Sequence, residues 1–313
     1  MGYTIGVDVG GTKIAGGLVD EAGRIVARTR RETPSTDPAA ILADIADVVR
    51  ELRAGQEVDA VGVGSAGFVD AARSTVLFAP NVAWRDVPMR DQVAAATGLP
   101  VVVENDGNAA AWGEFRFGAA EDVDDMVCVT VGTGIGGGIV LDGILFRGAH
   151  GVAAELGHMR VVPDGHPCGC GNRGCIEQYA SGRALEREAR ALAASGAGFA
   201  TRLVQLAGGN PDAISGRMVT RAATEGDELS RELLADLGRW LGAALASFAA
   251  LLDPAVFVIG GGVSEAGDLI LAPTAAAFRR NLPARGYRSA AHVRIATLGN
   301  DAGIVGAADL ARH

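Results

Sequence analysis

Three of the four cysteines and one histidine lie close together in the chain, in the pattern His-x9-Cys-x-Cys-x4-Cys. These residues are His158, Cys168, Cys170 and Cys175. Three thiolates and one imidazole complete the tetrahedral ligand set of Zn²⁺ and leave no open position for a substrate. A redox-active thiol pair and a cluster without metal are the alternatives. In a reducing compartment the spacing favours a metal site, so we predict a structural zinc ion.

Two glutamates flank this cluster. Glu155 precedes His158 by three residues, and Glu177 follows Cys175 by two. Both could be ordinary surface acids. A zinc loop would hold both carboxylates rigidly, however, and carboxylates held in this way can accept hydrogen bonds from the hydroxyl groups of a sugar. We therefore predict that both glutamates bind substrate.

A further acidic group follows an apolar segment. Residues 100–104, Pro-Val-Val-Val-Glu, are expected to form a strand that runs into Asn105 and Asp106. The carboxyl ends of strands are where α/β proteins place chemistry. Either residue could simply cap the helix that begins here. The catalytic interpretation gives Asp106 the task of accepting the proton of an attacking hydroxyl group, while the amides of Asn105 and Asn81 bind sugar hydroxyls without adding charge.

Three glycine-rich turns follow apolar strands and could hold phosphate groups. Clustered backbone N–H groups bind phosphate well, and glycine lets the backbone approach because it has no Cβ. The turns contain Gly10, Gly11, Thr12 and Lys13; Gly132, Thr133 and Gly134; and Gly260, Gly261 and Gly262. A single such turn is more often a plain hairpin, but three of them at strand ends favour phosphate binding.

Two other phosphate motifs are excluded. The chain contains no G-x-x-x-x-G-K-[ST] sequence, which a P-loop requires. Gly132, Gly134 and Gly137 match the dinucleotide pattern G-x-G-x-x-G, but that pattern must open a helix. Residues 138–141, Gly-Ile-Val-Leu, are typical of a strand instead, so we reject an NAD site.

Asp8 is an acidic residue within the first apolar strand, beside the first glycine turn. A carboxylate in such a strand is costly unless it serves a cation or a polar ligand. It could also cap the end of the strand. We favour a role in holding Mg²⁺, usually through water, because Mg²⁺ gives up its own water ligands reluctantly.

An α/β framework is needed to position these residues. Apolar runs predict strands at 3–9, 13–19, 58–63, 100–104, 126–131, 138–141 and 255–259. Apolar residues at helical spacing predict helices at 38–54, 88–98, 181–195, 199–207, 227–252 and 301–312. The pattern repeats, because residues 5–20 and 127–142 both have the order strand, glycine turn, strand. Such a repeat predicts two related lobes with a cleft between them for small ligands.

Composition limits the class of partner. The chain has 313 residues, of which 49% are hydrophobic and 21% charged, and its net charge is −9. This balance is that of a globular protein, and the length suffices for two lobes. The absence of a basic stripe argues against nucleic acid or an anionic membrane as a partner. We see no signal peptide and no apolar run long enough to span a bilayer, so we expect a cytoplasmic protein.

These motifs resemble those of the ROK family, which contains repressors and sugar kinases. The resemblance spans essentially the whole chain and includes Asp-x-Gly-Gly-Thr-Lys at 8–13, Asn105-Asp106, Gly-Thr-Gly-x-Gly-Gly at 132–137 and Glu-Leu-Gly-His at 155–158. The most specific segment is CGCGNRGCIEQYASG at 168–182.

The resemblance implies a two-lobed actin-like ATPase fold of the ribonuclease H-like type. Such a fold has a duplicated mixed sheet, flanking helices and a cleft between the lobes, which close on sugar and ATP. The expected smaller lobe comprises 1–112 plus 300–313. The expected larger lobe comprises 113–299, with the zinc loop and the nucleotide site.

The resemblance also implies residue roles. Asp106 would be the catalytic base, and ATP would bind near 10–13, 132–134 and 260–264. His158 would ligate zinc through one ring nitrogen and leave the other for a sugar hydroxyl. Gly67 belongs to a sugar loop at 64–70, in which Ala and Phe stand where many members have prolines. The implied sugar contacts are Asn81, Asn105, Glu155, His158 and Glu177.

The implied activity is transfer of the γ-phosphoryl group of ATP to glucose, because the chain is most similar to the ROK glucokinases of actinobacteria. Family kinases for fructose, N-acetylmannosamine or allose are alternatives, as is a sugar-sensing regulator with a vestigial kinase site. Polyphosphate could replace ATP as the donor. Family repressors carry a helix-turn-helix before the first strand, which begins here at residue 3, so no DNA-binding domain is expected. A homodimer or homotetramer is implied.

Overall fold

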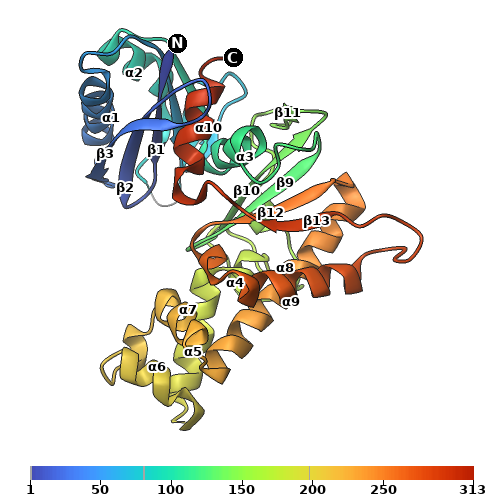
Figure 1. Cartoon of the computed structure of the whole chain (residues 1–313). Coiled ribbons are helices and arrows are strands. Elements are labelled where there is room, and N and C mark those ends of the chain that lie inside the picture. Colours follow the sequence, from blue (N-terminus) through green and yellow to red (C-terminus); the bar gives the residue numbers. More distant parts are fainter. Residues whose placement is uncertain (1, 80–81, 197) are drawn as a thin grey trace. The chain divides into compact units, whose positions relative to one another are not determined.

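The computed structural model describes residues 2–79, 82–196 and 198–313 and has a mixed α/β architecture (Figure 1). The chain forms two compact units. Unit 1 consists of Met1–Cys128, Gly137–Glu155 and Thr297–His313, and unit 2 consists of Val129–Gly136 and Leu156–Ala296. The lobe division expected from the sequence stays a prediction. It differs from these units because α3 (Asp106–Phe117) runs unbroken across residue 112 and because 137–155 belong to unit 1.

The first sheet has five strands in the order β3-β2-β1-β4-β8. β1, β2 and β3 are antiparallel neighbours, whereas β1, β4 and β8 run parallel. The register places Asp8 opposite Gly64, and Gly64 opposite Glu104, so three parallel strands bring their carboxyl ends to one edge. The strands are β1 (Tyr3–Val9), β2 (Lys13–Val19), β3 (Ile25–Glu32), β4 (Val58–Ser65) and β8 (Val101–Asn105).

Helices cover both faces of this sheet. α1 and α2 pack on one face, and α3 and α10 on the other (Figure 1). Asp37 caps α1, because its carboxylate accepts hydrogen bonds from the N–H groups of Ala39 and Ala40. The apolar face of α1 is buried against the strands through Ile41, Ile45, Val48, Val49 and Leu52. The bounds are α1 (Pro38–Arg53), α2 (Met89–Thr97), α3 (Asp106–Phe117) and α10 (Ala302–Leu310).

Two glycines let α10 approach the sheet without side chains in between. A Cβ on Gly6 of β1 would lie 1.9 Å from the carbonyl oxygen of Ile304. A Cβ on Gly62 of β4 would lie 1.7 Å from the carbonyl oxygen of Ala307. The atoms met are backbone atoms, so neither position accepts a larger residue unless the helix moves.

We expect Gly62→Ala to lower the free energy of unfolding by about 1–3 kcal/mol, the usual cost of overpacking, because α10 must move away from β4. Thermal and urea denaturation would measure this loss. Gly198→Ala is the matched control, since a Cβ there meets no atom within 4 Å. Equal midpoints for the two variants would contradict the close packing of α10.

A small sheet completes unit 1. Its three strands follow the order β5-β6-β7 and are antiparallel. The fully buried Trp84 lies just before its last strand and belongs to the same core as β1 and β4. The strands are β5 (Phe68–Val69), β6 (Val76–Phe78) and β7 (Arg85–Val87).

The second five-stranded sheet has the order β11-β10-β9-β12-β13, which repeats the order of the first sheet strand for strand. β10 and β11 are antiparallel, and β12 and β13 are parallel, as in the first sheet. The duplication predicted from the sequence is therefore confirmed. β9 and β10 contain residues of both units. The strands are β9 (Met126–Val131), β10 (Ile135–Leu141), β11 (Ile144–Leu145), β12 (Val256–Gly260) and β13 (His292–Ile295).

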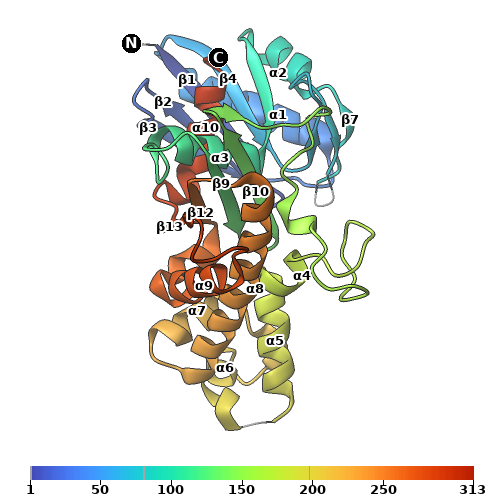
Figure 2. The same cartoon turned by 90° about the vertical axis from the view of Figure 1, so that its right-hand side faces the viewer.

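The helices of unit 2 are organised around α8 (Glu228–Leu252), which packs along α9 and beside α5 and α7 (Figure 2). Asp227 caps α8 by accepting a hydrogen bond from the N–H of Ser230. Within the described residues, α8 is the one helix long and apolar enough to cross a membrane, and 61% of its apolar window is buried inside the protein. The other helices are α4 (Glu177–Ala180), α5 (Gly182–Ala194), α6 (Thr201–Leu206), α7 (Gly216–Thr224) and α9 (Asp268–Asn281).

Candidate active site

Asp8 lies near the carboxyl end of β1 and is partly exposed. A Cβ on Gly303, in the first turn of α10, would lie 3.3 Å from the carboxyl carbon of Asp8. Burial and, to a smaller extent, the negative charge of Asp106 raise the pKa of Asp8 to about 7, against the opposing effect of Lys13. Two carboxyls that repel each other in this way are stabilised by a cation, so the pair fits the predicted Mg²⁺ site.

The raised pKa of Asp8 predicts a pH-dependent stability. The ordinary pKa of an aspartate is 3.8, so the folded protein binds this proton more tightly than the unfolded chain does. The bound proton makes its full contribution to the free energy of unfolding below about pH 4. This contribution is lost as the pH rises through about 7. We expect Asp8→Asn, with no added Mg²⁺, to raise Tm more at pH 8 than at pH 5. Equal shifts in thermal denaturation at the two pH values would contradict this expectation.

The turn between β1 and β2 is closed by backbone groups. The N–H of Gly10 donates to the carbonyl of Lys13 at 3.0 Å. The hydroxyl of Thr33 donates to the carbonyl of Gly10 at 2.8 Å, and its N–H donates to that of Thr12 at 3.2 Å. Thr12, at the tip, is exposed. The turn is therefore a compact hairpin, and its binding of phosphate stays a prediction.

Asn105 and Asp106 lie where β8 passes into α3. The side-chain oxygen of Asn105 accepts a hydrogen bond from the N–H of Asn108 at 3.0 Å, which caps α3. The amide nitrogen of Asn105 donates to the carbonyl of Gly67 at 3.0 Å. Asn105 is therefore both a helix cap and a contact of the predicted sugar loop.

Asp106 is the first residue of α3 and is partly exposed. Its Oδ1 accepts a hydrogen bond from the N–H of Gly107 at 2.9 Å. Burial raises the pKa of Asp106, against the hydrogen bonds from Gly107 and Asn105 that favour the charged form. A carboxylate with a raised pKa is a better proton acceptor than an ordinary aspartate.

Gly67 has a positive φ of +108°, and a Cβ there would lie 2.4 Å from the carbonyl oxygen of Phe78. Both facts require glycine at this position. Asn81 lies outside the described residues, so its predicted sugar contact stays a prediction.

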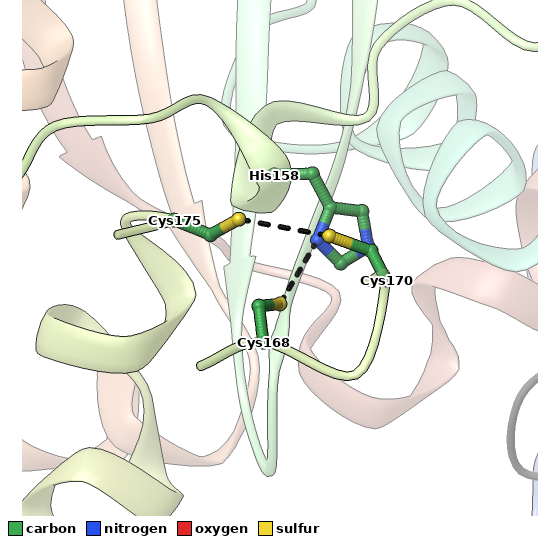
Figure 3. Close-up of side chains that lie close together, drawn as sticks. All are labelled: His158, Cys168, Cys170 and Cys175. Atoms are coloured by element: carbon green, nitrogen blue, oxygen red, sulfur yellow. Dashed lines mark hydrogen bonds between the residues drawn. The ribbon is translucent and has the colours of Figure 1, made fainter. Parts of the chain in front are cut away.

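The four predicted zinc ligands point toward one another (Figure 3). His158 ends the short helix η1 (Leu156–His158). All four ligand atoms lie within 4.8 Å of one another. Nδ1 of His158 lies 3.6 Å from Sγ of Cys168, and the sulfurs of Cys170 and Cys175 are 3.7 Å apart. Ligands at the normal zinc distances of ~2.0–2.3 Å in a tetrahedron are about 3.3–3.8 Å apart, so the cluster fits the ion.

Glu177, the first residue of α4, lies between this cluster and the second glycine turn. Its Oε2 accepts a hydrogen bond from the N–H of Ile135 at 3.0 Å, and its Oε1 lies 3.9 Å from Sγ of Cys168. A Cβ on Gly134 would lie 2.3 Å from Oε2. Glycine at 134 therefore makes room for this carboxylate.

The second and third glycine turns touch each other within unit 2. The N–H of Gly182, which begins α5, donates to the carbonyl of Gly132 at 2.7 Å. Gly261, just after β12, has a φ of +81°, and a Cβ there would lie 2.5 Å from the carbonyl oxygen of Val131. Gly262 then begins η4 (Gly262–Ala266). Two of the three predicted phosphate turns are thus brought together.

The predicted residues are grouped by unit. Unit 1 holds Asp8, the turn 10–13, Gly67, Asn105 and Asp106. Unit 2 holds the His/Cys cluster, Glu177 and the two remaining glycine turns. Glu155 is exposed, ends a unit 1 segment and directly precedes η1, which carries His158.

The model of the ROK family matches residues 4–313. This chain belongs to the ROK family. Over 313 residues it is 52% identical to a glucokinase of Streptomyces coelicolor, covering 100% of this chain and 98% of that protein. The crystal structure of a ROK family glucokinase from Streptomyces griseus in complex with glucose and AMPPNP is 53% identical, with a TM-score of 0.92 and 99% of each chain covered. The ROK hexokinase from Thermus thermophilus is 36% identical, with a TM-score of 0.82, 99% of this chain covered and 98% of that one.

Membership of the ROK family fixes the fold. ROK sugar kinases have the actin-like ATPase fold, and the two five-stranded sheets of equivalent strand order agree with it. The fold class predicted from the sequence is confirmed.

The structure also reveals an acidic residue of this ROK protein that the motifs did not indicate. Glu114 of α3 is buried, and its Oε2 accepts hydrogen bonds from the N–H groups of Ala119 at 2.9 Å and Thr297 at 3.0 Å. Its Oε1 accepts one from the N–H of Leu298 at 2.8 Å. The helix that begins at Asp106 is thereby tied to the residues that lead into α10. Only the tertiary fold reveals this contact, because 183 positions separate Glu114 from Thr297.

Proposed function

We propose that this chain is an ATP-dependent glucokinase, which transfers the γ-phosphoryl group of ATP to glucose and yields ADP and glucose 6-phosphate. The observation that carries the proposal is the full-length similarity to glucokinases, with 52% identity to the Streptomyces coelicolor enzyme. The Streptomyces griseus relative, in complex with glucose and AMPPNP, aligns over 99% of both chains, which supports the proposal.

Asp106 is the proposed general base. It stands at the end of a parallel strand, is held by the N–H of Gly107, and has a pKa raised by burial. In phosphoryl transfer such a group orients the attacking hydroxyl and takes its proton, while most of the catalysis comes from positioning and charge neutralisation. Asn105, held by its hydrogen bond to Gly67, is proposed to bind a neighbouring hydroxyl. The other proposed sugar ligands are Asn81, Glu155, His158 and Glu177.

The glycine turns are the proposed ATP site, with Gly10, Gly11, Thr12 and Lys13 in unit 1 and Gly132, Thr133, Gly134, Gly260, Gly261 and Gly262 in unit 2. Asp8 would hold Mg²⁺, which neutralises phosphate charge when it is bound. His158, Cys168, Cys170 and Cys175 would hold Zn²⁺, which would fix the loop between Glu155 and Glu177. The four ligands are spread over positions 158–175, so a bound ion would cross-link the loop.

An assay of ADP release with a panel of sugars tests the proposal. Glucose with ATP is expected to give a higher kcat/KM than fructose, N-acetylmannosamine or allose. If glucose 6-phosphate forms faster from polyphosphate than from ATP, the phosphoryl donor is polyphosphate and not ATP. Sugar binding in calorimetry without ADP release would instead favour a sugar-sensing regulator and overturn the kinase proposal.

We further propose that the enzyme is cytoplasmic and forms a homodimer or homotetramer. The size of the particle in solution, measured by sedimentation or light scattering, tests the second part. A monomer at micromolar concentration would contradict it.

A further inference from the structure

Glu104 is a buried carboxylate directly before the two residues of the proposed sugar and catalytic site. It is 1% exposed, although it is charged. Its Oε2 lies 2.7 Å from Nε of Arg147 and 3.2 Å from Nε of Arg73. Its Oε1 accepts hydrogen bonds from the N–H of Asn105 at 2.9 Å and from the side chain of Asn108 at 3.1 Å. A buried charge lowers the free energy of unfolding unless hydrogen bonds and opposite charges compensate it. The groups that pair with Glu104 are therefore important for the structure around it.

Arg147 joins the same carboxylate to the loop that contains Gly67. Its side chain is 11% exposed. Its two terminal nitrogens donate to the carbonyls of Ala71 at 2.9 Å and Asp70 at 2.8 Å. The rigid guanidinium fork suits this double contact, which a lysine could not reproduce. One side chain therefore spans the strand end and the loop.

The segment after Arg147 packs on the same loop. Gly151 has a φ of +84°, and a Cβ there would lie 2.7 Å from the N of Ala71. Four residues later comes Glu155, one of the proposed sugar ligands. The position of Arg147 on the loop thus fixes the start of the segment that leads to Glu155.

Arg73 holds the other end of the loop. It has a φ of +53°, which is unusual for a residue other than glycine, and its carbonyl accepts a hydrogen bond from the N–H of Val103 at 3.2 Å. The backbone of Arg73 is hydrogen-bonded to β8, and its guanidinium group faces Glu104. The loop therefore contacts the strand at two points.

We propose that Glu104, Arg73 and Arg147 form a positioning cluster, which sets the loop 66–75 and the segment 147–155 against Asn105 and Asp106 and so determines the affinity for sugar. This inference rests on the proposed glucokinase function. Two guanidinium groups share one carboxylate, so removal of the carboxylate leaves two neighbouring positive charges without the group that neutralises them, and the side chain of Arg147 is only 11% exposed. The contacts described above reach β8, α3 and the loop but no glycine turn, so the cluster acts on the sugar rather than on the nucleotide.

The test measures KM for glucose, KM for ATP and kcat for Glu104→Gln and Arg147→Lys. For both variants KM for glucose is expected to rise at least about 10-fold, as when a residue that orients a binding group is changed. KM for ATP is expected to stay within about 2-fold of the wild type, because the variants keep the interactions that bind the nucleotide. Arg147→Lys keeps the charge, so it remains informative where Glu104→Gln does not fold.

Asp309→Asn is the matched control. Asp309 is also a buried carboxylate of unit 1, and it accepts hydrogen bonds from Nε1 of Trp112 at 2.9 Å and Nε of Arg116 at 3.2 Å. Its substitution is expected to lower Tm without changing KM for glucose. This control separates a loss of stability from a loss of positioning.

The outcomes distinguish this inference from the proposed function. An inactive wild type would overturn the glucokinase proposal, and glucose binding to the same variants in calorimetry would still test the cluster. With an active wild type, an unchanged KM for glucose in both variants would overturn the cluster. So would an equal rise of both KM values, since that would indicate general damage to the site.

Discussion

Asp106→Asn is expected to lower kcat for glucose phosphorylation by at least ~10²-fold, the low end of the effect of a general base. The amide keeps the shape of the side chain and can still accept the hydrogen bond from Gly107, but it cannot take a proton. Glucose should therefore still bind. The ADP-release assay measures kcat, and calorimetry measures the dissociation constant of glucose.

Asp91→Asn provides the control for this experiment. Asp91 lies in the first turn of α2 and is exposed, so its variant changes the same charge at a helix start without touching the site. Its kcat should match that of the wild type. A near-normal kcat for the Asp106 variant would remove this residue from its proposed role.

Loss of the metal is expected to have the largest effect on stability. Cys170→Ala should reduce zinc from about one ion per chain to almost none, and should lower Tm by on the order of 5–10 °C, because the folded loop depends on its ligands. Cys170 is exposed, so its thiol contributes little packing, and a loss of stability reports the metal. Elemental analysis and thermal denaturation give the two quantities.

Cys128→Ala is the control that tests whether the loss of stability in Cys170→Ala comes from loss of the metal. Cys128 is buried in β9, outside the cluster, so its variant should lose some packing but keep its zinc.

Burial, with the neighbouring thiols Cys170 and Cys168, raises the pKa of Cys175 to about 12 when no metal is bound. Zinc must then displace protons, and its affinity should fall as the pH is lowered. A fully stable wild type without metal would end the zinc proposal.

The framework could be predicted because its central strands are almost wholly apolar. β1, β4, β9 and β12 are buried along nearly their whole length, and apolar residues and glycine predominate in their sequences. The strand expected at 138–141 begins earlier, at Ile135, so the second glycine turn is shorter than the sequence pattern indicated. The helix expected at 199–207 is a short 3₁₀ turn followed by α6.

Other elements gave no such signal. β3 is an edge strand with no fully buried residue, so it lacks the alternation of a half-buried strand. α9 contains Pro273, which normally argues against a helix interior. In the fold this proline packs on α8, where a Cβ on Gly238 would lie 2.9 Å from its ring. Tertiary contact therefore compensates for poor local propensity.

The site was predicted as separate motifs, because each motif is local in the sequence. The contacts that connect them are not local. Glu104 meets Arg147, and Glu177 meets Ile135, across 43 and 42 positions, and neither pair belongs to a spacing pattern. Residue types at strand ends indicate what could react, whereas the groups that hold them become visible only in the folded chain.

The attachment of α10 to the first sheet has a consequence for biosynthesis. β1 ends at residue 9, and the helix that covers it begins at residue 302. A ribosome therefore makes all the residues of unit 2 before α10 can cover the part of the first sheet around Gly6 and Gly62. Contacts of such long range slow folding and leave apolar surface open to chaperones in the meantime. Unit 2, with its nearly continuous stretch 156–296, should mature on the nascent chain before unit 1 is completed.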